Sequence, residues 1–249
     1  MIEHFYIFFI LIFVAAGFVK GITGMGLPTV AMGLLGTFIP LPLAAALLVI
    51  PSMVTNIWQL FSGPALIPII KRLWPMMLCI TISTIIGSAF LIYINPTWSS
   101  IGLGLALLIY AGYALFSPSF TIPKQVESWL SPCIGIITGF VTGATGVFVM
   151  PAVPYLQSLN FDKDELVQAL GLSFTISTIA LMVGLYIYGS YQVNQLSLSI
   201  FAVIPALVGM WLGQKIRIKI SPQQFKKLFL WFLVILSLEL ILHPFLQIN

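Results

Sequence analysis

The chain has 249 residues, of which 60% are hydrophobic and only 6% are charged. Because water-soluble domains carry roughly 25% charged residues, this composition excludes an ordinary soluble enzyme, a disordered chain and a nucleic-acid-binding module. The formal net charge of +4 reflects loop placement in a membrane protein rather than an acidic partner. We therefore predict an all-α, multi-pass protein of the cell (inner) membrane, surrounded by lipid bilayer.

Two apolar regions are interrupted by residues that break helices. Ile2–Ile39 is broken at Gly21–Pro28, and Leu130–Leu159 is broken at Gly143–Gly146, with Pro151 soon after. Because Gly and Pro clusters of this density disrupt helices, we expect each region to form two shorter pieces around an unwound centre. Each pair would enter the membrane and return on the same side as a re-entrant hairpin.

Six further apolar runs are long enough to cross a bilayer, which takes about 20 residues. These runs are Leu41–Phe61, Leu73–Ile94, Trp98–Phe116, Leu166–Tyr188, Leu196–Gly213 and Phe225–Phe245. At about 1.5 Å per residue, Ile2–Val19 is itself long enough nearly to span. Eight full spans are therefore an alternative to six spans with two re-entrant hairpins.

The two interruptions carry copies of one motif. Gly17–Gly24 and Gly139–Gly146 share the pattern G-F-V-x-G-x-T-G at an offset of 122 residues. Later, Gly87 with a following Asn-Pro matches Gly213 with a following Ser-Pro. We therefore predict a tandem duplication, with residues 1–120 as the first membrane repeat and residues 129–249 as the second.

Charged loops predict how the repeats are oriented. The loops that hold Lys71–Arg72 and Lys215–Lys219 are basic and should be cytoplasmic, whereas the uncharged loops at Asn95–Thr97 and Gly189–Gln195 should face outward. Equivalent loops of the two halves then lie on opposite sides of the membrane. This pattern predicts two inverted repeats, each with a broken helix pair and three spanning helices, and both termini outside.

Lys20 is the most informative charge, since it interrupts an apolar run just before the first break. A lysine inside a membrane is costly and is a functional candidate by default. One interpretation is that Lys20 neutralises a bound anion, with Thr142 at the equivalent place in the second half. The other is that Ile2–Val19 spans fully and Lys20 extends to the membrane surface.

The breaks offer groups that suit a small oxyanion. Half-helices beginning near Gly26 and Val147 would direct positive N-terminal ends at the membrane centre, and glycine lets backbone approach a ligand. Polar stripes on two spans, with Asn56 and Ser173 as the best cases, could line the same cavity. The residues that we expect at the substrate are Lys20, Gly21, Thr23, Gly24, Asn56, Thr142, Gly143, Thr145, Gly146 and Ser173.

Small residues at a spacing of four also permit close packing of membrane helices. We expect this packing role for Gly17, Gly139, Gly209 and Gly213. Glu239 and His243 are four residues apart, so they share a helix face and could couple protons to anion movement. The alternative is a wetted pair at the end of the last helix.

The duplicated glycine–threonine element with its following proline, the small-residue runs at Ala46 and Ala169, and the Gly213–Arg217 stretch resemble the sulfite exporter TauE/SafE family of membrane transporters. The resemblance covers essentially the whole chain. It implies movement of small sulfur-containing anions such as sulfite or organosulfonates. We expect a secondary transporter, with a coupling proton or ion as a possible partner and with no catalytic residue, metal or cofactor. An anion channel and a membrane scaffold subunit without transport are the alternatives.

Overall fold

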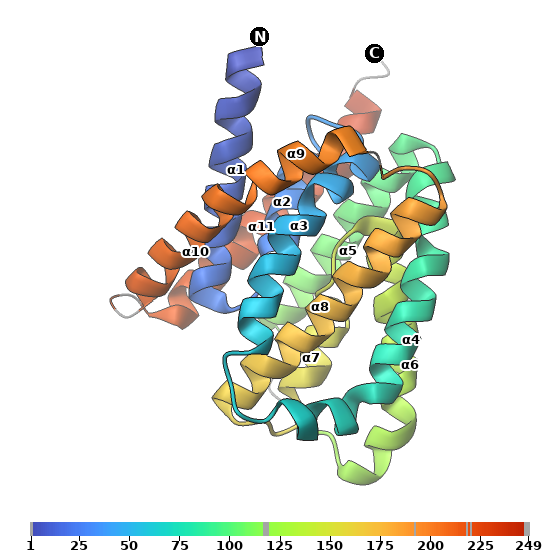
Figure 1. Ribbon diagram of the computed structural model, residues 1–249, viewed down its shortest axis with the longest axis vertical. Helices are drawn as coiled ribbons and strands as arrows, with labels where there is room; N and C mark the ends of the chain where they lie inside the picture. The colour runs from blue at the N-terminus through green and yellow to red at the C-terminus, as the bar shows by residue number, and fades with distance from the viewer. Residues whose placement is uncertain (1, 117–119, 192, 218, 220, 247–249) are drawn as a thin grey trace.

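The computed structural model describes residues 2–116, 120–191, 193–217, 219 and 221–246. Within these ranges the fold is all helical, without strands, as predicted (Figure 1). The helices are α1 (Ile2–Thr23), α2 (Leu27–Leu35), α3 (Leu41–Leu60), α4 (Leu66–Tyr93), α5 (Pro96–Phe116), α6 (Lys124–Thr145), α7 (Ala152–Gln157), α8 (Lys163–Ile187), α9 (Val193–Phe201), α10 (Val203–Arg217) and α11 (Pro222–Leu246).

In the described part of the chain, six segments are long and apolar enough to cross a membrane. Five of them contain or match predicted spans and lie in α3, α4, α5, α8 and the consecutive pair α9–α10. The sixth is Tyr6–Thr23 of α1. The remaining predicted run, Phe225–Phe245, lies within α11, which carries Lys226, Lys227 and Glu239 and is not among the six.

Both breaks are displaced from the positions that the sequence predicts. The helix α1 continues through Gly21 to Thr23, so that only Gly24–Gly26 is non-helical before α2. The second half-helix was predicted near Val147, which is wrong, because α7 begins at Ala152. The residue before a proline avoids the helical region of φ and ψ, so Pro151 delays the start of this helix.

A proline inside α3 ties this helix to α9. Pro51 has no N–H and cannot bond the carbonyl of Leu47, one turn earlier. The hydroxyl of Ser199 in α9 donates to that carbonyl instead, at 2.8 Å. The backbone group that proline frees is therefore satisfied inside the protein, as a membrane interior requires.

The most extensive helix contacts join the first half of the chain to the second. The helix α1 packs along α10, α6 along α4, α3 against α8, and α5 against α11. In Figure 1, the start of α1 and the end of α11 lie at the upper end, and α3 descends while α8 rises. The halves are therefore interlocked rather than two separate bodies.

Glycines make the closest of these contacts possible. A Cβ on Gly139 of α6 would lie 2.6 Å from the carbonyl oxygen of Ile80 in α4. On α1 and α10, a Cβ on Gly17, Gly209 or Gly213 would likewise collide with backbone of the facing helix. The packing role predicted for these four glycines is confirmed.

An ion pair joins the N-terminal parts of α4 and α6. Arg72 donates from Nε to Glu127 Oε1 at 2.6 Å and from Nη2 to Glu127 Oε2 at 2.8 Å. The same guanidinium donates to the carbonyl of Leu159 at 3.1 Å and lies over the ring of Phe161. This two-bonded geometry is the strong form of the pair.

We expect Arg72→Met to lower the apparent melting temperature of the purified protein by several degrees, because it removes four contacts and leaves the mostly buried Glu127 carboxylate without its cation. The neighbouring exposed residue supplies the control, Lys71→Met, which should melt like the wild type. Equal melting of all three proteins would show that the ion pair does not stabilise the fold.

Candidate anion site

Lys20 lies inside the protein, with 2% of its surface exposed. Its ammonium donates to Thr55 Oγ1 at 3.0 Å and makes a short hydrogen bond to Asn56 Oδ1. The amide of Asn56 in turn donates to Thr178 Oγ1 at 3.1 Å. The interpretation that Lys20 extends to the membrane surface is therefore wrong. Instead, the three helices α1, α3 and α8 meet at a buried polar cluster, which we call the Lys20 cluster: Lys20, Thr55, Asn56 and Thr178.

No carboxylate of the described residues pairs with Lys20, since the ion pair found among them joins Arg72 to Glu127. The ligands of the ammonium are a neutral hydroxyl and a neutral amide. Burying a cation without a counter-ion is expensive. The Lys20 cluster therefore carries an uncompensated positive charge, which a bound anion would neutralise.

Several buried hydroxyls on α3 and α8 have no hydrogen-bond partner among the described residues. They include Ser52 on α3 and Ser173 and Ser177 on α8. Buried polar atoms are normally paired, so such exceptions call for an explanation. Hydroxyl groups can rotate to donate to a bound oxyanion. Ser173, a predicted site residue, thus lies buried on one of the helices of the Lys20 cluster with its hydroxyl uncommitted.

The first break adjoins this cluster. Gly24 has φ +77°, a left-handed conformation that favours glycine. Its carbonyl accepts a hydrogen bond from Gln59 Nε2 at 2.6 Å, which ties the break to α3. The hydroxyl of Thr23 lies within donating distance of the carbonyls of Val19, at 2.9 Å, and Met25, at 2.6 Å, and it accepts from the N–H of Met25 at 3.2 Å.

The second break repeats this geometry. Gly146 has φ +71°, and its N–H donates to the carbonyl of Thr142 at 2.7 Å. The hydroxyl of Thr145 donates to the carbonyl of Val141 at 2.6 Å and accepts from the N–H of Val147. Thr142 Oγ1 donates at 3.4 Å to the carbonyl of Val147, so no cation stands at the place equivalent to Lys20.

The two threonine hydroxyls therefore hold the breaks in shape. We expect Thr145→Val to lower the free energy of unfolding by about 1 kcal/mol, because a buried backbone N–H loses its acceptor. Thr145→Ser retains the hydroxyl and should unfold like the wild type. Equal thermal stability of the valine and serine variants would contradict a capping role.

Gly21 and Gly143 lie in helix contacts rather than in the breaks. Gly21 faces the backbone of α10, and a Cβ on Gly143 would collide with the backbone of α4 near Ser88. Packing explains both glycines. Their predicted contact with substrate stays a prediction.

Sequence reasoning placed Asn56 and Ser173 on polar stripes but missed that Thr55 and Thr178 complete the environment of Lys20. Helical spacing indicates which residues share a face, whereas the meeting of α3 with α8 depends on the tertiary fold. For the predicted proton pair, Glu239 is exposed on α11, and the side chain of His243 lies outside the described residues.

Comparison with known proteins agrees with this architecture. Residues 9–240 match the protein family described as Sulfite exporter TauE/SafE. Neither the curated proteins nor the solved structures yielded a match. The matched segment covers nearly all of the chain and includes both breaks and the Lys20 cluster. The chain therefore belongs to the sulfite exporter TauE/SafE family and is a multi-pass protein of the cell membrane.

Proposed function

We propose that this protein is a secondary transporter that carries a small sulfur-containing anion, such as sulfite or an organosulfonate, through the Lys20 cluster. The single observation that carries the proposal is a fully buried ammonium with only neutral ligands in the described structure. Family membership supports membrane transport of sulfur anions rather than enzymatic catalysis. The anion would replace Thr55 or Asn56 as the partner of Lys20. The Lys20 ammonium would then neutralise part of the charge of the anion.

We further propose that residues 1–120 and 129–249 are inverted repeats. The contact of α1 with α10 corresponds, when the halves are exchanged, to the contact of α6 with α4. Asn56 and Thr178 are 122 residues apart, the offset of the duplicated motif, and they bond one another. A contact between equivalent residues is expected on an axis that relates two halves, and this supports placing the Lys20 cluster at the membrane centre.

The short helices support re-entrant breaks. The helices α2 and α7 have 9 and 6 residues, about 14 Å and 9 Å of length at the rise of an α-helix, and a hydrocarbon core is ~30 Å thick. Gly24 is held by Gln59, one residue before the end of α3. The long N-terminal parts of α1 and α6 would extend toward opposite surfaces.

This arrangement suggests how access could alternate. The first break adjoins the Lys20 cluster through Gln59. Each break is followed by a short helix that would be able to shift without disrupting a full span. Movement of one half against the other would open the cluster to one side at a time. A secondary transporter needs a driving gradient, so the proposal includes a coupled proton or ion gradient.

The test is uptake of radiolabelled sulfite into proteoliposomes that contain the purified protein. We expect uptake that saturates with concentration and that unlabelled organosulfonate inhibits. Resolvable single-channel current in a planar bilayer would instead favour the anion channel. Absence of flux for every sulfur anion, together with co-purification of an obligate partner, would favour the scaffold subunit.

A further inference from the structure

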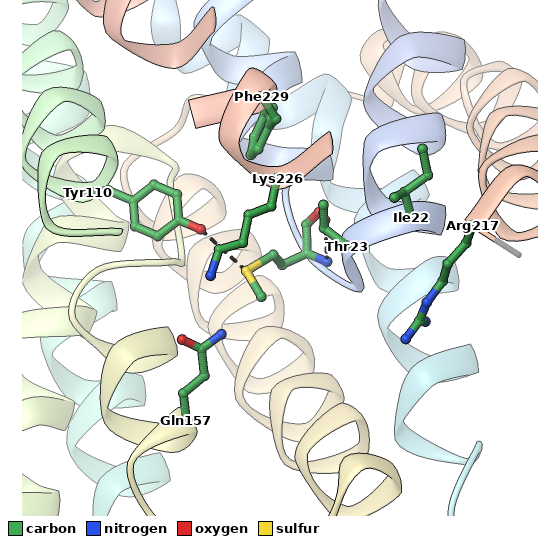
Figure 2. A pocket seen from close by; sticks show the side chains of 8 residues that line it. Ile22, Thr23, Tyr110, Gln157, Arg217, Lys226 and Phe229 are labelled. Carbon is green, nitrogen blue, oxygen red and sulfur yellow. Dashed lines mark hydrogen bonds between the residues drawn. The ribbon is translucent and has the colours of Figure 1, made fainter. Parts of the chain in front are cut away.

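A cavity of about 180 Å³ lies beneath the first break and is separate from the Lys20 cluster. Its lining combines the end of α1 and the first break with α5, α7, α10 and α11, and includes Thr23, Tyr110, Gln157, Arg217 and Lys226. Figure 2 shows the Lys226 ammonium directed into the space between Tyr110 and Gln157, with Arg217 on the other side of Thr23. Five helices and one break thus line a cavity that holds two cations.

The charged side chains that line this cavity, among the described residues, are all positive. None of the described residues that line it is acidic, and neither Arg217 nor Lys226 forms an ion pair with a described carboxylate. Two uncompensated cations in a hollow with apolar walls concentrate anions there. The cavity volume suits an oxyanion of a few heavy atoms.

Neutral donors complete the site. The Tyr110 hydroxyl donates to Met25 Sδ at 3.3 Å, and a thioether sulfur is a weak acceptor that a charged oxygen would displace. Gln157 offers amide N–H groups at the end of α7. Arg217 is exposed at the end of α10, where the positive-inside rule places the cytoplasm.

We propose that this cavity is an anion-capture site on the cytoplasmic side, which binds a sulfur oxyanion through Lys226, with Arg217 adding to the positive potential, before the anion reaches Lys20. The proposal rests on the proposed transport function. Capture and transfer involve no covalent step. The anion exchanges its contacts with Lys226 for contacts with Lys20 as the first break moves.

The test measures sulfite uptake into inside-out membrane vesicles, which expose the cytoplasmic face. We expect Lys226→Gln and Arg217→Gln to raise the half-saturating sulfite concentration about threefold or more at low salt, with the maximal rate unchanged. High salt should shrink the difference because it screens exposed charges. Lys226→Arg should behave like the wild type.

The matched controls are Lys227→Gln and Lys219→Gln, since both residues are exposed cations close in sequence that do not line the cavity. Both controls should keep the wild-type half-saturation. An equal rise in the controls, or no rise with Lys226→Gln, would overturn the proposal. An effect that requires anionic phospholipid in reconstituted liposomes, and that vanishes in phosphatidylcholine alone, would assign the cavity to a lipid headgroup phosphate instead.

Calorimetric titration of sulfite into the purified Lys20→Met protein separates this proposal from the transport function. Sulfite binding to the Lys20→Met protein that is lost in the double variant Lys20→Met with Lys226→Gln supports the capture site, even if the wild type shows no flux. Absence of binding to Lys20→Met, or binding that Lys226→Gln leaves unchanged, overturns it.

Discussion

Replacement of Lys20 by methionine reduces sulfite uptake into proteoliposomes by about ten- to a hundredfold, the range expected when a charge-assisted contact of 1.5–3 kcal/mol is lost. Methionine fills a similar volume, so the helices α1, α3 and α8 can still pack. Because the variant removes the cation and no described carboxylate needs it as a partner, the protein should stay folded. The loss should therefore appear in transport rather than in thermal stability.

Two variants sharpen this prediction. Lys20→Arg keeps the charge and should retain part of the uptake, whereas Lys71→Met removes an exposed charge and should retain all of it. If the Lys20→Met variant takes up sulfite at the wild-type rate and with unchanged affinity, the buried ammonium does not contact the anion. Loss of folded protein would be detected independently by size-exclusion chromatography and would point to a structural role.

Substitution of Gly139 by leucine prevents recovery of folded, monodisperse protein. A Cβ at this position would lie 2.6 Å from the carbonyl oxygen of Ile80 and 2.8 Å from the side chain of Ser83. Helix backbone cannot yield as a flexible side chain can, so α6 would separate from α4. Gly139→Ala adds only the Cβ and should cost about 1–3 kcal/mol, the usual range for overpacking.

Gly102 supplies the matched control, because it lies in α5 and nothing is within 4 Å of a Cβ built there. Gly102→Leu should fold and melt at least as well as the wild type, since leucine favours the helix more than glycine does. Similar yields for the two leucine variants would contradict close packing of α4 and α6.

The apolar spans and the two helix breaks were predictable from the sequence, because each depends on residues that are close together in the chain. Five of six predicted runs coincide with apolar helices long enough to span, because about 20 apolar residues without a break have few alternatives to a membrane helix. Both breaks follow from clustered glycine and proline. Their limits were less predictable, because Gly21 and Gly143 remain helical where neighbouring helices need the space.

The candidate site was predictable only in part. Lys20 was identified as a costly charge, but its burial depends on contacts with Thr55 and Asn56, which lie 35 and 36 residues away. The sequence does not reveal that Arg217 and Lys226 line a cavity. Basic residues mark cytoplasmic loops whether or not they line a cavity. Only the tertiary fold brings Lys226 toward Tyr110 and Gln157.

In the proposed transporter, the anion is held against the buried ammonium of Lys20. The most direct measurement is an anomalous difference map of crystals grown with selenite, a heavier analogue of sulfite. We predict a selenium peak within hydrogen-bonding reach of Lys20 Nζ and Asn56, and its loss in Lys20→Met crystals. Well-occupied selenium elsewhere in the protein with none at Lys20 would show that Lys20 does not hold the anion.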